Sequence, residues 1–130
     1  MITHLLDADW LIDAINGVES AYSVVERLVD RGEVATSVVV LGEVREGLLA
    51  SGISPKRQQR FEALADAMEV IPIERGLVPW FADLRYRLRS TGRIIGDHDI
   101  WIAATALEYD LTLISRDRHF DRIPNLKLYS

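Results

Sequence analysis

Cysteine is absent from this 130-residue sequence, and lysine occurs only twice. Without cysteine the chain has no disulfide bond, no thiolate zinc site and no cysteine nucleophile, and it suits a reducing compartment. No apolar run approaches the length that spans a bilayer. The first residues lack the basic stretch and long apolar region of a signal peptide. We therefore expect a cytoplasmic protein with no membrane partner.

Basic residues are outnumbered by acidic ones, and they are unevenly distributed. The net charge is −5, which argues against binding nucleic acid through bulk charge alone. Residues 1–50 hold nine acidic and three basic residues, whereas residues 51–130 hold eleven and twelve. Thirteen of the fifteen basic residues are arginine. The planar guanidinium fits phosphate oxygens, but a codon preference for arginine produces the same bias, so phosphate contact needs other support.

The order of the expected elements indicates the fold class. The length fits a single domain over residues 1–130, with no visible repeat or linker. Strands are expected at 2–6, 34–36, 70–73, 111–115 and 126–129, and helices at 9–16, 20–30, 38–49, 55–67, 77–88 and 97–109. Short apolar strands that alternate with helices predict an α/β fold, in which helices flank a central, mostly parallel sheet.

Polar residues follow several of these strands. In parallel sheets, ligands bind beyond the carboxyl ends of the strands. Asp7 follows the first expected strand and Asp117 follows the strand at 111–115, while Ser37 and Glu74 come shortly after two others. We therefore expect the two aspartates to lie near each other at one edge of the sheet.

Three further acidic residues lie in apolar surroundings. Glu43 interrupts the apolar stretch 38–44, and Asp97 and Asp99 precede an apolar helix body at 100–107. Taken singly, each acid has an ordinary explanation as a helix cap, a first-turn residue or a solvent-facing side chain. Taken together, several carboxylates in one pocket stay ionised only around a divalent cation. Oxygen ligands favour Mg²⁺ or Mn²⁺ over zinc.

Four stretches of the chain also match a known pattern in its order. They are LLDADWLID at 5–13, GEVREGL at 42–48, IGDHDIWIAA at 95–104 and LISRDRHF at 113–120. With these stretches the chain resembles the PIN-domain ribonucleases, and most closely the VapC-type toxins of bacterial toxin–antitoxin pairs. The resemblance extends over most of the chain and implies a three-layer PIN-like domain.

The resemblance also implies which residues form the site. The family's metal-binding acids correspond here to Asp7, Glu43, Asp99 and Asp117. Asp99 is preferred to Asp97 because the family's acid directly precedes the apolar helix, which leaves Asp97 as an auxiliary ligand.

Two more residues near these acids have expected supporting roles. Ser115 matches a hydroxyl residue that orients the last acid or a water on the metal. The family usually has Thr or Ser and then a small polar residue after the first acid, where this chain has Ala8 and Asp9. Asp9 is thus expected either to add a carboxylate to the site or to cap the following helix.

The activity implied by the resemblance is hydrolysis of RNA phosphodiesters, in tRNA or rRNA loops, with Mg²⁺ or Mn²⁺ activating water. Arg93, Arg116 and Arg118 flank the expected site and are our choice for contacts to RNA phosphates. The histidines are given no role. The resemblance further implies a homodimer and a cognate antitoxin that silences the toxin.

Two other functions remain open at this stage. Asp7 and Asp9 form an Asp-x-Asp pair after a strand, as in haloacid-dehalogenase-like phosphatases, where they would serve as nucleophile and acid/base. Against this, the Gly-Thr turn of that family is missing and both lysines are poorly placed. A catalytically inactive PIN-like binding module is the second alternative.

Overall fold

A four-stranded parallel sheet forms the centre of the protein, as described by a computed structural model of residues 1–130. Its strands are β1 (His4–Leu6), β2 (Val34–Ser37), β3 (Glu69–Ile71) and β4 (Thr112–Ile114), in the order β3-β2-β1-β4. Leu5 on β1 pairs with Ala35 on one side and Leu113 on the other. Because the strands are parallel, their carboxyl ends meet at one edge of the sheet.

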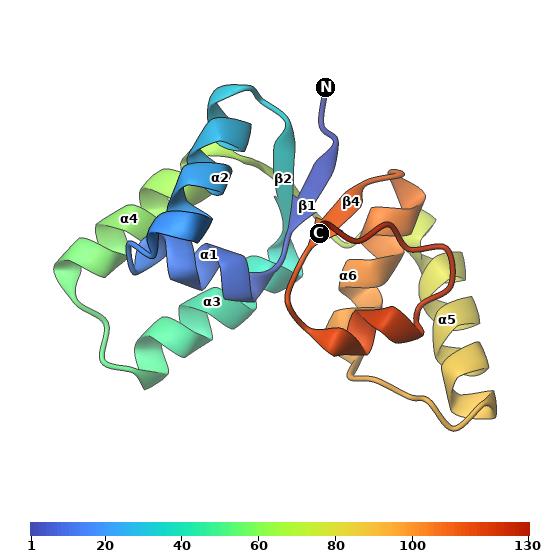
Figure 1. The fold of residues 1–130 in the computed structure, drawn as a ribbon. Helices are drawn as coiled ribbons and strands as arrows, with labels where there is room; N and C mark the ends of the chain where they lie inside the picture. The colour runs from blue at the N-terminus through green and yellow to red at the C-terminus, as the bar shows by residue number, and fades with distance from the viewer.

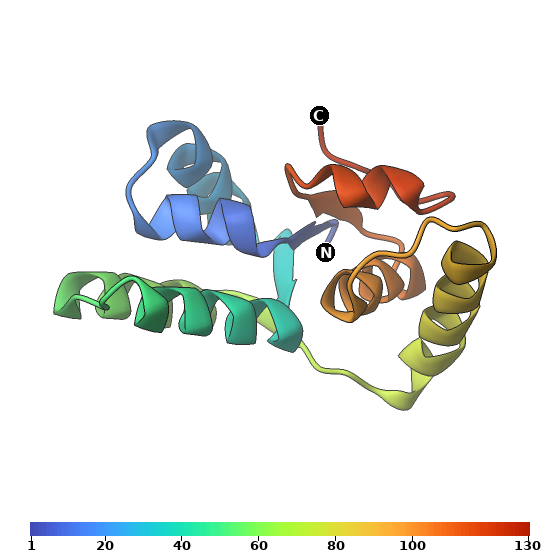
Figure 2. The same cartoon turned by 90° about the horizontal axis from the view of Figure 1, so that it is seen from below.

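Helices cover both sides of this sheet, so the α/β prediction is confirmed. They are α1 (Ala8–Ile15), α2 (Glu19–Asp30), α3 (Val38–Ala50), α4 (Pro55–Ala67), α5 (Val78–Ser90) and α6 (Asp97–Glu108), with short 3₁₀ turns η1 (Arg75–Leu77) and η2 (Arg118–Arg122). Helices α1–α4 lie on one side and α5 and α6 on the other (Figure 1), and the view from below shows the same division (Figure 2). No helix combines the length and apolar character that a membrane crossing requires.

Local signals explain where most helices begin and end. The Ser37 side chain accepts a hydrogen bond from the Val39 N–H, and the Ser54 side chain accepts one from the Arg57 N–H. Both serines are therefore N-caps, and Pro55 occupies the first turn of α4, where its missing N–H is harmless. Gly92 adopts a positive φ of 68° just after α5, a conformation that side chains disfavour. These boundaries agree with the sequence predictions.

The predicted strand at 126–129 is wrong. This segment forms only an isolated parallel bridge between Leu113 and Leu128. Asn125 has a positive φ of 66° and follows Pro124, so the chain bends immediately before the segment. It then makes two backbone hydrogen bonds along β4, from Leu113 to Lys127 and from Tyr129 to Leu113.

The core fixes the two elements that lead into the sheet edge. Leu5 and Leu6 of β1 are fully buried, as are Ile100, Ile102 and Ala103 of α6. Burial of a leucine or isoleucine side chain stabilises the fold by about 1.5–3 kcal/mol. As a result, the end of β1 and the first turn of α6 are held in place from both sides of the sheet.

Candidate metal centre

Asp7 lies where β1 ends and α1 begins. Its backbone N–H donates to the Ile114 carbonyl on β4 at 3.0 Å, and its carboxylate accepts a hydrogen bond from the Ser115 hydroxyl at 2.6 Å. The side chain is buried. Burial raises the pKa of Asp7 to about 6, although the hydrogen bond from Ser115 acts in the opposite direction. The carboxylate is thus held in one orientation in a place that disfavours its charge.

Asp117 lies directly after β4 and is linked to Asp7 through Ser115. The Ser115 oxygen that donates to Asp7 also accepts the Asp117 N–H at 3.1 Å. The Asp117 carboxylate caps η2 by accepting the His119 N–H at 2.9 Å. One hydroxyl therefore contacts both acidic residues, at the carboxylate of Asp7 and at the backbone of Asp117. The orienting role of Ser115 stays a prediction.

Glu43 approaches the same edge from α3. One of its carboxylate oxygens, Oε1, is buried and accepts no hydrogen bond. Burial raises the pKa of Glu43, and the charge of Asp7 raises it further. The imidazole Nδ1 of His98 lies 3.9 Å from Oε1. A buried carboxylate oxygen without a partner is costly unless something binds it.

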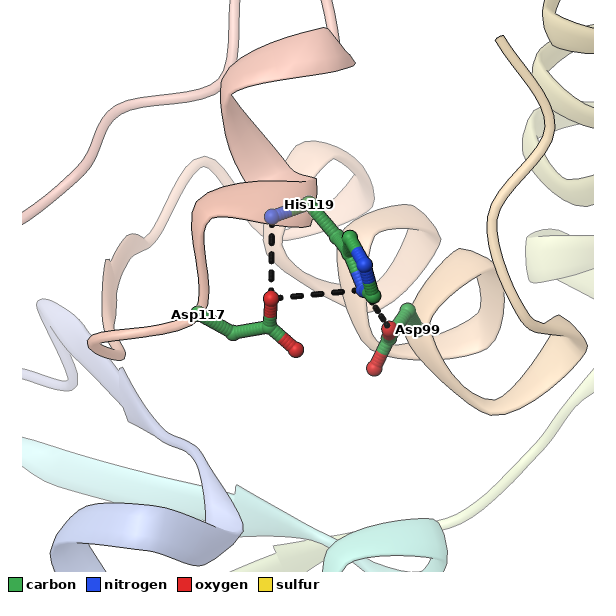
Figure 3. A group of neighbouring side chains, drawn as sticks. All are labelled: Asp99, Asp117 and His119. Carbon is green, nitrogen blue, oxygen red and sulfur yellow. Dashed lines mark hydrogen bonds and ion pairs between the residues drawn. The ribbon is translucent and has the colours of Figure 1, made fainter.

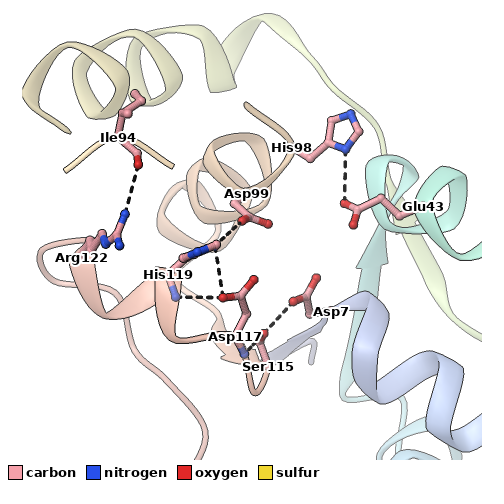
Figure 4. A network of polar contacts seen from close by, with 9 residues as sticks. All are labelled: Asp7, Glu43, Ile94, His98, Asp99, Ser115, Asp117, His119 and Arg122. Atoms are coloured by element: carbon pink, nitrogen blue, oxygen red, sulfur yellow. Dashed lines mark hydrogen bonds and ion pairs between the residues drawn. The ribbon is translucent and has the colours of Figure 1, made fainter. Parts of the chain in front are cut away.

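Asp99 completes the group from the first turn of α6. Its side chain is 19% exposed. Burial raises the pKa of Asp99, and the neighbouring charge of Asp117 adds to this effect. A cavity of about 530 Å³ opens here, lined by Glu43, Asp99 and Asp117 among others and by no hydrophobic residue. Figure 4 shows that the four carboxylates, including Asp7, face a common space from three sides.

The donor set of this group fits a divalent cation. No lysine or arginine forms an ion pair with any of the four carboxylates. Their pKa values rise where shifts are resolved, first because the carboxylates are buried and then because they lie near one another. Carboxylate oxygens are the ligands that hard cations such as Mg²⁺ and Mn²⁺ prefer.

Asp97, the expected auxiliary ligand, lies apart from the four. Its side chain is 57% exposed, and its carboxylate pairs with the Arg85 Nε of α5 at 3.0 Å. It lines the rim of the same cavity. The ion pair with Arg85 thus joins the Asp97 carboxylate to α5. Glu74, the acid after β3, is exposed and does not line this cavity.

Asp9 makes two backbone contacts through its carboxylate. Its Oδ1 accepts the Trp10 N–H in the first turn of α1 at 2.7 Å, and its Oδ2 accepts the Arg116 N–H at 2.8 Å. The Arg116 guanidinium lies 2.6 Å from Asp13, one helical turn further along α1. Together these contacts fasten the segment after β4 to α1. The side chain of Arg116, expected to contact RNA, is thus engaged within the protein, whereas Arg93 and Arg118 are exposed.

His119 is the residue that the sequence analysis missed. Its Nδ1 lies 3.3 Å from Asp117 Oδ1 and 3.4 Å from Asp99 Oδ2, as Figure 3 shows. The feature of the sequence that could have indicated it is the spacing of Asp117 and His119, two positions apart. An aspartate that caps its own turn brings the residue two positions later back toward its carboxylate. That signal is common in loops, so it does not identify a site by itself.

Comparisons with known proteins agree with this arrangement. The PIN domain family matches residues 4–126. The chain is 31% identical over 127 residues to Ribonuclease VapC2 of Rickettsia felis, and the alignment covers 96% of this chain and 95% of that relative. It is 40% identical over 90 residues to Ribonuclease VapC5 of Mycobacterium tuberculosis, and this alignment covers 67% of this chain and 66% of that relative.

A solved structure extends the similarity to three dimensions. It is the crystal structure of VapBC2 from Rickettsia felis bound to a DNA fragment from their promoter. The match has a TM-score of 0.87 and 30% identity, and it covers 99% of this chain and 98% of that one. On the evidence of the family match, the relatives and this fold, the chain belongs to the PIN-domain family, among its VapC ribonucleases.

Proposed function

We propose that residues 1–130 form a single domain that acts as a divalent-metal-dependent endoribonuclease, the toxin of a toxin–antitoxin pair. The observation that carries this proposal is the group of four carboxylates at the carboxyl edge of the sheet, none paired with lysine or arginine. The names of the relatives, all VapC ribonucleases, support the choice of RNA as substrate.

The proposed roles follow from the contacts. Asp7, Glu43, Asp99 and Asp117 would hold the cation, which we take to be Mg²⁺ or Mn²⁺. Such a cation supplies a Lewis acid that lowers the pKa of a water and neutralises charge on the scissile phosphate. Ser115 orients Asp7 and Asp117 through its two hydrogen bonds. Asp9 holds the backbone of the loop that carries Asp117.

The RNA would approach across the open side of the cavity. Arg93, in the loop before α6, and Arg118, next to Asp117, are exposed and remain our choice for phosphate contacts. The Arg116 guanidinium pairs with Asp13, so we expect it to contribute less to RNA binding than the other two. Loops of tRNA or rRNA are the proposed targets.

The proposed partner is a cognate antitoxin. The similar chain from Rickettsia felis was solved within VapBC2 on promoter DNA, and this chain matches it over nearly its whole length. We expect the antitoxin to place basic charge over the four acids, since no lysine or arginine of this chain pairs with them.

The direct test is cleavage of a total tRNA pool, with the RNA ends mapped, by the wild-type protein with Mg²⁺ or Mn²⁺. We expect discrete cuts that disappear with EDTA and in Asp99→Asn. Asp97→Asn is the matched control, two positions away in the first turn of α6, and should still cut. If a folded, metal-binding wild type leaves tRNA intact, ribosomal RNA is tested next, and failure with both substrates contradicts the proposed activity.

The two alternatives have their own tests. A phosphatase that uses Asp7 and Asp9 would hydrolyse an aryl phosphate, but Asp9 is occupied by the Arg116 N–H and the chain belongs to another family. We expect no such hydrolysis. An inactive binding module would neither bind Mn²⁺ nor cut RNA, so calorimetric titration with Mn²⁺ separates it from the proposed nuclease.

A further inference from the structure

The imidazole of His119 occupies an unusual place for a surface histidine. Its Nδ1 lies between two carboxylate oxygens from different elements, Asp99 on α6 and Asp117 after β4. Three potential ligand atoms, one from each of these residues, all lie within 4.8 Å of one another. Figure 3 shows the ring edge directed at both carboxylates.

The distances are those of ligands that share an ion. Metal–ligand bonds of about 2.1–2.2 Å place neighbouring ligands of an octahedral ion roughly 3 Å apart. The two separations of His119 Nδ1 are 3.3 and 3.4 Å. A strong charge-assisted hydrogen bond from the ring to a carboxylate would be shorter, at about 2.7–2.9 Å.

The backbone fixes this position. The His119 N–H donates to Asp117 Oδ1 at 2.9 Å, so the turn is closed by the same carboxylate that the ring approaches. Phe120, the next residue, is fully buried and anchors η2 in the core. By contrast, His98 approaches only one acid, Glu43, at 3.9 Å, and its side chain is 73% exposed.

We propose that His119 is a ligand of the divalent cation, through Nδ1, beside Asp99 and Asp117, and that this nitrogen makes the site prefer Mn²⁺ to Mg²⁺. Imidazole nitrogen suits transition metals, whereas Mg²⁺ prefers oxygen ligands and retains water. Ligation requires the tautomer that carries its proton on Nε2. The inference rests on the proposed metal site and adds a residue and a metal preference to it.

Mn²⁺ itself is the probe. Metal-free protein would receive one equivalent of Mn²⁺, and pulsed electron paramagnetic resonance would detect any nitrogen-14 bound to the ion. We expect a directly bound nitrogen in the wild type and in His98→Gln, and its loss in His119→Gln. In titrations, His119→Gln should weaken Mn²⁺ binding by at least about tenfold, which is the loss typical when a group that only hydrogen-bonds to a metal ligand is removed. The same substitution should weaken Mg²⁺ binding much less.

Each other outcome has a defined meaning. Bound Mn²⁺ without nitrogen coupling in the wild type, or coupling lost in His98→Gln instead, overturns the role of His119 and leaves the four-carboxylate site intact. Equal weakening of Mn²⁺ and Mg²⁺ binding in His119→Gln overturns the metal preference. If the wild type binds no Mn²⁺, both this inference and the proposed metal-dependent function fail.

Discussion

Asp7 is the residue whose burial has the clearest energetic consequence. Its pKa of about 6 in the folded protein lies above its ordinary value of 3.8. Well below pH 3.8 the group is protonated in both states and there is no penalty. As the pH rises toward 6 the unfolded chain ionises first, so folding stability falls. Above pH 6 the full penalty is present, about 3 kcal/mol for a shift of this size.

Because of this penalty, we expect Asp7→Asn to increase folding stability by an amount that depends on pH. In EDTA, the variant should be more stable than the wild type by about 2–3 kcal/mol at pH 7.5, and the difference should nearly vanish at about pH 3, as measured by urea unfolding. Asn keeps an oxygen that can accept from Ser115. A difference in stability that is the same at both pH values would contradict this explanation.

Asp99 and Asp97 offer a matched pair two positions apart. Asp99→Asn should lower RNA cleavage at least about 100-fold, because the cation contributes several kcal/mol to such a reaction. Asp97→Asn removes an exposed ion pair with Arg85, worth about 0–1 kcal/mol of stability, and should change cleavage only a few-fold. The check is the initial rate on one mapped RNA. Equal losses would mean that Asp97 also serves the site.

At the scale of elements, the segment between β4 and η2 is held by α1. Asp9→Ala removes the acceptor of the Arg116 N–H, which is worth roughly 1–2 kcal/mol. We expect faster hydrogen exchange of the Arg116 amide and weaker Mn²⁺ binding, because Asp117 lies on the same segment. The measurement is amide exchange by NMR, with metal titration on the same samples.

Asp9→Asn is the control for that substitution, since it keeps an acceptor oxygen. In this variant the Arg116 amide should exchange its hydrogen at nearly the wild-type rate. Asp13→Ala removes only the ion pair to the Arg116 guanidinium and should affect the amide less. If Asp9→Ala leaves the Arg116 amide protected, α1 does not hold this segment.

For the whole molecule, the resemblance to VapC toxins predicts a homodimer. A groove that Glu43 helps to line also contains the apolar residues Val38, Ile73 and Trp101, and the side chains of Val38 and Ile73 are exposed. Exposed apolar groups in one patch favour association. We expect wild-type protein to sediment as a dimer and Ile73→Glu to shift it toward the monomer of 14.7 kDa. A monomeric wild type at micromolar concentration would contradict the prediction.

Local features of the sequence determined most of the elements. Serine caps, glycines after helices and short apolar runs act over a few residues, so α3, α4 and the four strands were predicted close to their observed positions. The segment at 126–129 was not, since whether an extended segment pairs along its length depends on a partner far away in the sequence. Its apolar residues contact β4 at one bridge only.

The motif pattern indicated the four acids, but only the tertiary structure decided how their neighbours are used. The hydrogen bonds of Ser115 to Asp7 and of Arg116 to Asp9 join residues 108 and 107 positions apart. No local pattern encodes such contacts. The sequence by itself thus determined the fold class and a set of carboxylates at one sheet edge. The packing of α6 against α5 and of the last loop against α1 decided that Asp97 pairs with Arg85, that Arg116 is engaged, and that His119 faces the acids.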